Sequence, residues 1–290
     1  MFISGDFSSG TTLLFTMFRH VEGCCCFYEP LHERLLNWLI WPPRVWEGHV
    51  HAENYVKEYR GLDAVRQLSR PEWGYSRLHL DADADEPELE RYLRYLIGSG
   101  YGKAPCVVLK ENRFTFRLGW LRAHFPEARI VNVWRDCEEQ WRSWVRRSQE
   151  YRGVEDVGQD SVEFRAFRLP DWCDDLKSTY PELGAERSSS GYERFSKLWQ
   201  LSREQHERFA DVCVSLDELR NDFDRACERI SAAVGFELEP TRLRHLVSRG
   251  GAGRSATGIE ARAARLLDRA GARYAAARLE LMRRRGKLAA

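Results

Sequence analysis

The sequence predicts an α/β fold, with a central parallel sheet flanked by helices as a three-layer sandwich. Apolar runs of strand length alternate along the chain with segments that show the 3.6-residue periodicity of amphipathic helices. This alternation is typical of parallel sheets, because each strand needs a crossover helix before the next strand can begin. A length of 290 residues is compatible with one domain of this class.

Four short apolar runs are the expected strands of this sheet. They are Phe2 to Ser4, residues 106–110 (CVVLK), residues 128–134 (ARIVNVW) and residues 211–216 (DVCVSL). Runs without polar alternation indicate strands that are buried on both faces. Ligands of such sheets bind at the carboxyl ends of the strands, so the turns that follow these runs are the candidate site.

Helical periodicity occupies the segments between the strands. The expected helices cover residues 11–18, 114–125, 137–148 and 224–235, with further helical patches at residues 31–40 and 87–98. Asp136 with Glu139 fits a helix cap with a reciprocal acid, Pro126 ends one helix, and Gly235 closes another. We expect a single domain over residues 1–290, with a helical, aromatic-rich insertion at about 31–100 on the acceptor side and a C-terminal helix at about 258–285.

Composition excludes several classes of protein. The net charge of +1, from 45 basic and 44 acidic residues, argues against a dedicated nucleic-acid-binding protein. No run of eighteen apolar residues and no secretory signal is visible, so no membrane span is expected. The eight cysteines contain no Cys-x-x-Cys pair, which disfavours a metal site or a disulfide framework. We interpret them as reduced, mostly buried thiols of a cytoplasmic protein.

The segment GDFSSGTT, residues 5–12, lies between the first strand and the first helix. Its spacing, Gly-x-x-x-x-Gly followed by two hydroxyl residues, is that of a P-loop-like phosphate cradle. Glycines let backbone N–H groups converge on an anion, and the helix N-terminus adds partial positive charge. An ordinary Gly/Ser turn is the alternative interpretation. Thr11 stands where the nucleoside triphosphatase version has Lys, which disfavours a nucleotide-dependent kinase.

Two motifs carry a resemblance to a known family. GDFSSGTTLL resembles the 5′-phosphosulfate-binding loop of sulfotransferases that use PAPS (3′-phosphoadenosine 5′-phosphosulfate). Residues 110–144 resemble the 3′-phosphate-binding block of the same family: Lys, a helix, Phe-Pro-x-Ala, a strand, Arg-Asp, then Ser eight residues after the Arg. The pattern is most similar to the tyrosylprotein and carbohydrate branches, and it covers roughly residues 1–30 and 105–235.

The resemblance implies a set of donor-binding residues. The expected contacts of the 5′-phosphosulfate are Ser8, Ser9, Gly10, Thr11 and Thr12. Arg135 and Ser143 would bind the 3′-phosphate, and both follow the strand at 128–134. The alternatives are a surface ion pair of Arg135 with Asp136 or Glu139, and a neutral helix-surface role for Ser143.

The resemblance also implies two catalytic residues. Glu29 would be the general base that accepts the proton of the acceptor hydroxyl, and Lys110 would neutralise charge near the transferred sulfuryl group. A turn-fixing Glu before Pro30 and a solvated strand-end Lys are the alternatives. His32, His49 and His51 are substitutes for the base.

Ser8 departs from the family pattern, because an Arg or Lys normally precedes Ser-Gly-Thr-Thr. Lys110, Arg113 or a distant Arg could replace that cation, or the protein could be a degenerate module that binds PAP or PAPS without transfer. The expected activity is in-line transfer of a sulfuryl group from PAPS to a hydroxyl group, with PAP as product and no metal. The acceptor, a small molecule, carbohydrate or peptide, is not readable from the sequence.

Overall fold

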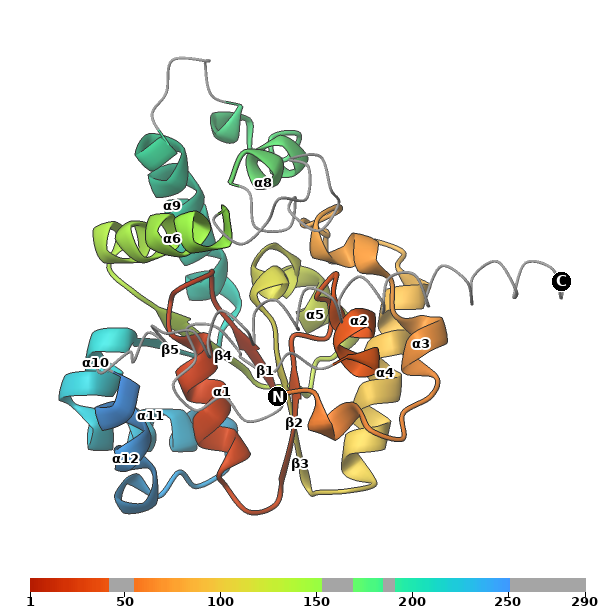
Figure 1. The fold of residues 1–290 in the computed structure, drawn as a ribbon, viewed down its shortest axis with the longest axis vertical. Helices are drawn as coiled ribbons and strands as arrows, with labels where there is room; N and C mark the ends of the chain where they lie inside the picture. Colours follow the sequence, from red (N-terminus) through yellow and green to blue (C-terminus); the bar gives the residue numbers. More distant parts are fainter. Residues whose placement is uncertain (42–54, 153–168, 185–190, 251–290) are drawn as a thin grey trace, which may run out of the picture.

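The computed structural model describes residues 1–41, 55–152, 169–184 and 191–250 (Figure 1). Five parallel strands form one sheet in the order β2-β3-β1-β4-β5. They are β1 (Phe2–Ser4), β2 (Cys24–Tyr28), β3 (Cys106–Lys110), β4 (Ile130–Trp134) and β5 (Val212–Ser215). The predicted α/β class with a central parallel sheet is confirmed, and each of the four predicted strands is present.

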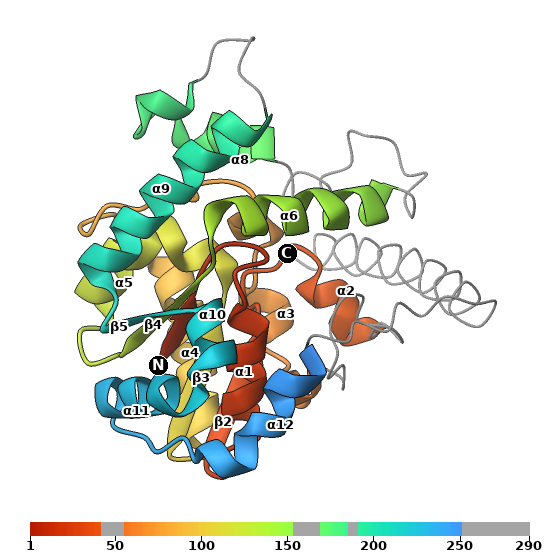
Figure 2. The same cartoon turned by 90° about the vertical axis from the view of Figure 1, so that its left-hand side faces the viewer.

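Helices cover both faces of the sheet (Figures 1 and 2). One layer contains α1 (Thr11–Arg19), α11 (Phe223–Val234) and α12 (Pro240–Gly250). The other contains α4 (Pro87–Tyr101), α5 (Leu118–His124) and α9 (Gly191–Phe209). The crossover from β1 to β2 runs one way across the sheet, and the three later crossovers run the other way. Right-handed connections therefore place α1 on one face and α4, α5 and α9 on the other.

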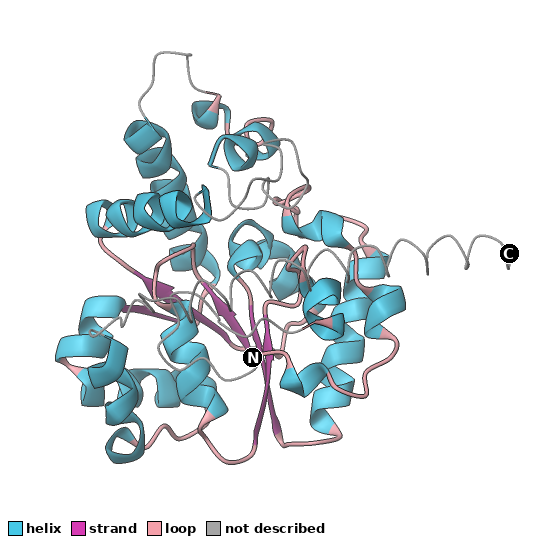
Figure 3. Cartoon of the chain, in the orientation of Figure 1, coloured by secondary structure: helices cyan, strands magenta, loops and turns pink. Residues whose placement is uncertain are grey.

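The remaining helices are short or lie beyond the sheet (Figure 3). They are α2 (Leu35–Ile40), α3 (Val65–Leu68), α6 (Cys137–Arg152), α8 (Leu169–Leu176) and α10 (Leu216–Asn221), with 3₁₀ helices η1 (Lys57–Tyr59), η2 (Pro71–Gly74), η3 (Asn112–Arg117) and η4 (Pro181–Leu183). The helical patches predicted near residues 31–40 and 87–98 correspond to α2 and α4. The predicted strand at 211–216 ends at Ser215, whose hydroxyl accepts from Glu218 N and caps α10.

Strand β2 is not among the strands predicted from the sequence. Three consecutive cysteines followed by Phe and Tyr form this edge strand, and Glu29 comes directly after it. Cysteine packs as a small hydrophobe, and Cys25 and Cys26 are buried here. The strand pairs in parallel with β3 along its whole length.

The helix predicted over residues 114–125 is a second difference. The segment begins as the 3₁₀ helix η3, and α5 begins only at Leu118. All six side chains of η3 are buried, which an amphipathic α-helix with one solvent face does not permit. The tighter 3₁₀ turn distributes the side chains around the axis and buries them in different surroundings.

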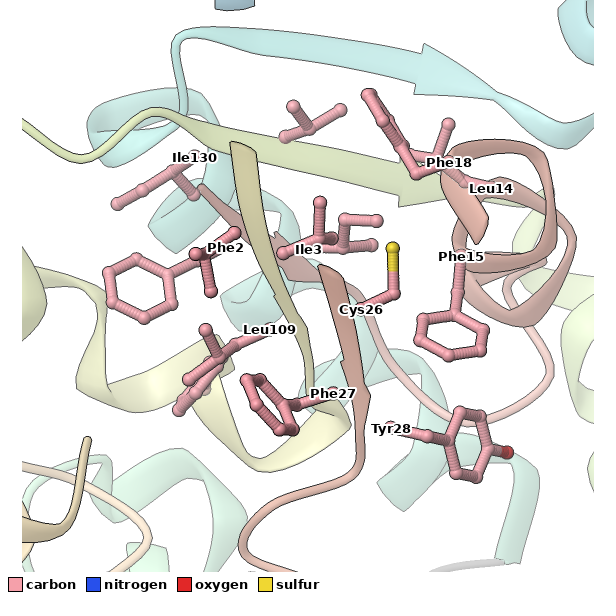
Figure 4. Packing of buried hydrophobic residues seen from close by; sticks show 14 of the residues in the cluster. Phe2, Ile3, Leu14, Phe15, Phe18, Cys26, Phe27, Tyr28, Leu109 and Ile130 are labelled. Carbon is pink, nitrogen blue, oxygen red and sulfur yellow. The ribbon is translucent and has the colours of Figure 1, made fainter. Parts of the chain in front are cut away.

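The hydrophobic core lies between the sheet and its helices. Figure 4 shows Phe2 and Ile3 of β1 among side chains of α1, β2 and β3. Phe2 packs edge-on against Phe114 at 5.2 Å between ring centroids, an arrangement that aromatic pairs favour. A second cluster, which includes Phe7, Trp144 and Trp172, packs α6, α8 and α9 against the turn after β1.

This topology determines where a ligand would bind. The connection after β1 leads to β2, and the connection after β4 leads to β5 on the other side of the sheet. Because β1 and β4 are neighbours, a crevice opens between the segments that follow them. Residues 5–10 follow β1 and Arg135 follows β4, as the sequence predicted.

Some predictions fall outside the described residues. They concern His49, His51 and the helix at 258–285. Among the helices that the structure describes, none combines the length and the apolar character needed to cross a membrane.

Candidate functional site

The turn at residues 5–10 requires its two glycines. A Cβ atom at Gly5 would lie 2.4 Å from the Val133 carbonyl oxygen, a separation that no side chain tolerates. Gly10 has a φ of 111°, in the left-handed region that favours glycine, and its Cβ would lie 2.8 Å from Leu216. The turn is also closed by a hydrogen bond from Ser9 N to the Asp6 carbonyl, at 3.2 Å.

The end of this turn suits an anion. Helix α1 begins at Thr11, and no side chain caps it at Gly10, so its first N–H groups face outward from the helix end. The hydroxyl oxygens of Ser8 and Ser9 are buried and have no hydrogen-bond partner among the described residues. Uncapped N–H groups at a helix N-terminus attract anions, and unpaired hydroxyls add donors. The loop therefore fits a phosphate or sulfate group.

Glu29 and Lys110 are in direct contact. Strands β2 and β3 are neighbours in which Tyr28 pairs with Lys110, and this register places Glu29 beside the lysine. Lys110 Nζ donates to Glu29 Oε1 at 2.5 Å and lies 4.7 Å from the centroid of the Tyr28 ring. The two predicted catalytic side chains thus form one buried ion pair.

Electrostatics hold this pair in its charged form. Burial raises the pKa of Glu29, but the positive charges of Lys110 and Arg113 outweigh burial and hold that pKa below its usual range. Burial lowers the pKa of Lys110, and Glu29 opposes that effect. A carboxylate with a lowered pKa is a weak proton acceptor, so Glu29 needs a change in its surroundings before it can serve as a strong base.

Arg113 binds three carboxylates next to the Glu29–Lys110 pair. Its guanidinium donates to Glu29 at 3.2 Å, to Glu111 at 3.2 Å and to Glu33 at 2.8 Å. It also donates to the Gly74 carbonyl, at 3.3 Å, and its side chain is fully buried. All of its nitrogens are therefore engaged. Arg113 positions carboxylates and is not a mobile cation that could replace the one missing at Ser8.

A chain of hydrogen bonds joins the turn to the ion pair. Thr11 Oγ1 donates to Asn112 Oδ1 at 3.1 Å, and Asn112 Nδ2 donates to Glu29 Oε1 at 3.4 Å. Asn112 was not singled out from the sequence, where it lies between the expected strand at 106–110 and the expected helix at 114–125. The structure brings together Thr11, Asn112, Glu29 and Lys110.

The backbone is strained both in the turn at residues 5–10 and at Glu29. Among the described residues, positive φ in a residue other than glycine occurs at Ser8 (67°), Glu29 (41°) and Arg77 (51°). Such conformations cost roughly 1–3 kcal/mol each, and they concentrate at functional sites. Two of these residues are predicted site residues, which supports the assignment.

His32 accompanies Glu29 and does not replace it. Its Nε2 atom lies 3.6 Å from Glu29 Oε2, and its Nδ1 atom accepts a hydrogen bond from Arg34 N at 3.0 Å. The accepting Nδ1 indicates that the proton of the neutral ring is on Nε2, facing Glu29. Burial holds the pKa of His32 well below its usual value, so the ring is neutral at physiological pH.

Arg135 and Ser143 lie on the β4 side of the crevice. Arg135 Nε donates to Glu139 Oε2 at 3.0 Å, which is the ion pair considered as an alternative for this residue. Asp136 Oδ1 accepts from Glu139 N at 3.0 Å and caps α6 as predicted. Ser143 is 6% exposed on the same helix. In the described part of the chain, no hydrogen bond joins Arg135 or Ser143 to the Glu29–Lys110 pair.

Asp6 lies in a small polar cavity beside the turn. The cavity is lined by side chains that include Ser9, Asn132 and His206. Burial raises the pKa of Asp6 to about 7, and hydrogen bonds with Ser202 and Thr115 oppose this only in part. The sequence-based interpretation missed this cavity, because its far wall belongs to α9, which was not predicted.

His206 of α9 is neutral in that cavity. Its Nδ1 atom donates to the Ser202 carbonyl at 2.6 Å, and its Nε2 atom accepts from Ser4 Oγ at 3.0 Å. Burial lowers the pKa of His206 to about 3. The neutral ring thus ties α9 to the end of β1.

Asp6→Asn should raise stability in a pH-dependent manner. The pKa of Asp6 is about 7 in the folded protein, against an ordinary value of 3.8. Between these values the folded state retains a proton that the unfolded state has lost, so the wild type loses stability as the pH rises from 4 to 7. The variant escapes this loss, which amounts to about 2–4 kcal/mol. Urea unfolding at pH 4, 6 and 8 should show an advantage that grows with pH.

The control for this effect is Asp63→Asn, at an exposed carboxylate. It should show no comparable trend. A stability difference between Asp6→Asn and wild type that stays constant from pH 4 to pH 8 would contradict the burial of an ionisable Asp6.

Sequence comparison identifies a family. A sequence model of the sulfotransferase family matches residues 1–240. A search of curated proteins finds no matching sequence. Within the described residues, no group of three or more His, Cys, Asp or Glu side chains is placed to hold a metal ion.

Proposed function

The chain belongs to the sulfotransferase family, and from this membership we propose that it transfers a sulfuryl group from PAPS to a hydroxyl group of an acceptor. The observation that carries the proposal is the buried pair of Glu29 and Lys110, joined through Asn112 to Thr11 of the anion-binding turn. A proton acceptor, a cation and an anion cradle are thereby connected by direct contacts.

The proposed donor site has two parts. The 5′-phosphosulfate would bind the turn through Ser8, Ser9, Gly10, Thr11 and Thr12. The uncapped start of α1 and the unpaired hydroxyls of the two serines support this assignment. The 3′-phosphate would bind Arg135 and Ser143, and Arg135 would exchange its bond to Glu139 for a bond to the phosphate. Arg suits this role because its planar group binds phosphate through two parallel hydrogen bonds.

The proposed catalytic roles follow from the ion pair. Glu29 would accept the proton of the acceptor hydroxyl, and Lys110 would stabilise the negative charge that gathers on the bridging oxygen as the S–O bond breaks. When Lys110 turns toward the donor, Glu29 loses its closest cation. Its pKa then rises, because an opposite charge favours the ionised carboxylate and its removal has the reverse effect. Donor binding would in this way strengthen the base.

The displacement itself would be in line. Transfer of a sulfuryl group through a loose transition state depends mainly on positioning and on charge neutralisation, as phosphoryl transfer does. Arg113 would hold Glu29 in position from below through its bond at 3.2 Å. We propose PAP as the second product and a hydroxyl-bearing small molecule, carbohydrate or peptide as the acceptor.

Donor preference tests the proposed 3′-phosphate site. PAP should raise the melting temperature clearly more than AMP, because the additional phosphate makes charge-assisted hydrogen bonds worth about 1.5–3 kcal/mol each. Arg135→Ala should remove most of that difference. Arg142→Ala is the matched control, since Arg142 is also paired with a glutamate four residues away on α6 but is exposed. Equal shifts for PAP and AMP in the wild type would contradict the assignment.

A donor-binding module without transferase activity is the second candidate function. The observation that favours it is Ser8, which offers a short hydroxyl side chain where the family has a cation. In that case PAP would bind as described, but single-turnover assays with PAPS would show no transfer to any hydroxyl acceptor. Transfer to even one acceptor decides in favour of the enzyme.

A further inference from the structure

Two cysteines lie side by side at the amino ends of strands β2 and β3. Cys24 begins β2, Cys106 begins β3, and the two residues are direct register partners. Neighbouring strands lie about 4.8 Å apart, and a disulfide requires a separation of about 4.4–6.8 Å between Cα atoms. Residues in register on parallel strands project to the same face. The backbone therefore meets the distance requirement of a disulfide without rearrangement.

The two thiols lie close enough to influence each other's ionisation. The interaction with Cys24 lowers the pKa of Cys106 to about 7, and the interaction with Cys106 raises the pKa of Cys24. Both side chains are partly exposed, whereas Cys25 and Cys26 on the same strand are buried. The thiolate is the reactive form of cysteine. Cys106 is thus an accessible nucleophile with a second thiol beside it.

We propose that Cys24 and Cys106 form a reversible disulfide when the protein meets a small disulfide such as oxidised glutathione. The Cys106 thiolate attacks one sulfur of oxidised glutathione, its S–S bond breaks, and one glutathione leaves as a thiolate. Cys24 then releases its proton to solvent and attacks the Cys106 sulfur, which expels the second glutathione. Two cysteines are oxidised and one oxidised glutathione is reduced to two thiols.

The position of this bond separates it from the proposed reaction. Glu29 and Lys110 follow or end the same two strands at their carboxyl ends, while Cys24 and Cys106 begin them. The bond would join β2 to β3 on the side away from the site and would close the whole segment 24–106 into a loop. A cross-link of this kind restricts the unfolded chain, so the oxidised protein should unfold at higher urea than the reduced one.

The test uses the full chain and oxidised glutathione under native conditions, followed by alkylation of free thiols, digestion and mass spectrometry. We expect two of the eight thiols to disappear, a cross-linked peptide that joins Cys24 to Cys106, and its loss on reduction. In Cys24→Ala, Cys106 should keep one glutathionyl group because no neighbouring thiol displaces it. Cys213→Ser, at another partly exposed cysteine, should form the cross-link as the wild type does.

The pH dependence gives an independent measurement. At constant oxidised glutathione, the initial rate for Cys106 should rise about tenfold from pH 6 to pH 8, whereas an ordinary thiol would rise about 75-fold. Three outcomes would overturn the proposal: all eight thiols remain free, the cross-link joins Cys106 to Cys26, or Cys106 in Cys24→Ala takes up no glutathione. None of these readouts depends on sulfuryl transfer, so they are unaffected if the proposed function fails.

Discussion

Glu29→Gln should slow single-turnover sulfuryl transfer from PAPS by about 10²–10⁴-fold, the range that a general base contributes. Glutamine has nearly the shape of glutamate, and its one amide oxygen can keep either the hydrogen bond from Lys110 or the bond from Arg113, which reach different oxygens of Glu29. It cannot take up the proton of the acceptor hydroxyl. The affinity for PAP should change little, since Glu29 contacts Lys110, Asn112, Arg113 and His32 and is not part of the turn that is proposed to bind the donor.

The control is Glu33→Gln, which removes another buried carboxylate bound by the same guanidinium of Arg113. It should disturb the charge network to a similar degree and yet lose far less activity. The measurement is transfer from labelled PAPS across a panel of hydroxyl acceptors, with PAP affinity followed by calorimetry. Equal losses in the two variants would show that Glu29 acts only through the network, and transfer at the wild-type rate in Glu29→Gln would exclude it as the base.

Arg113→Met should destabilise the folded protein by about 3–5 kcal/mol, the range seen when one partner of a buried ion pair is removed. The substitution leaves Glu29, Glu33 and Glu111 buried without the guanidinium that binds all three. Urea unfolding at pH 7 should show a clearly lower midpoint. Arg113→Lys keeps the charge but loses the planar set of donors, so its unfolding midpoint should lie between those of the wild type and Arg113→Met.

The pH dependence of the stability deficit in Arg113→Met tests whether unpaired buried charge is its cause. Without Arg113, the pKa of one or more of these carboxyl groups rises above its unfolded value. The folded state then keeps protons that the unfolded state releases, so the deficit grows as the pH rises above about 4.5 and shrinks below it. A deficit that is the same at pH 4.5 and pH 7 would point to lost packing in place of unpaired charge.

The parts of this fold that depend on local pattern were predictable. Continuous apolar runs revealed β3 and β4, and the two glycines of residues 5–12 revealed the turn, because such positions limit which residues can occupy them. Strand β2 was not predicted, because a run of cysteines is compatible with a strand, a buried helix or a metal site. The long helix α9 was not predicted either, so the wall that it contributes to the Asp6 cavity was not predicted.

Contacts between distant segments could not be predicted from the sequence. The ion pair of Glu29 and Lys110 exists because β2 and β3 are neighbours, and a sheet order of β2-β3-β1-β4-β5 does not follow from the alternation of strands and helices. Similarly, the sequence placed Arg113 between the expected strand at 106–110 and the expected helix at 114–125, but its three carboxylate partners come from the turn after β2 and from the end of β3. Residue types indicated the chemistry, and tertiary structure decided which residues meet.

The contact at 2.5 Å between Lys110 and Glu29 also bears on kinetic order under the proposed roles. An acceptor that arrives before the donor meets a carboxylate whose lone pairs are already occupied, so its hydroxyl cannot form a productive complex. An acceptor that arrives after the donor meets a carboxylate that Lys110 has released. The ion pair would therefore impose a compulsory sequence on a two-substrate reaction, with the nucleotide as leading substrate and as last product to leave.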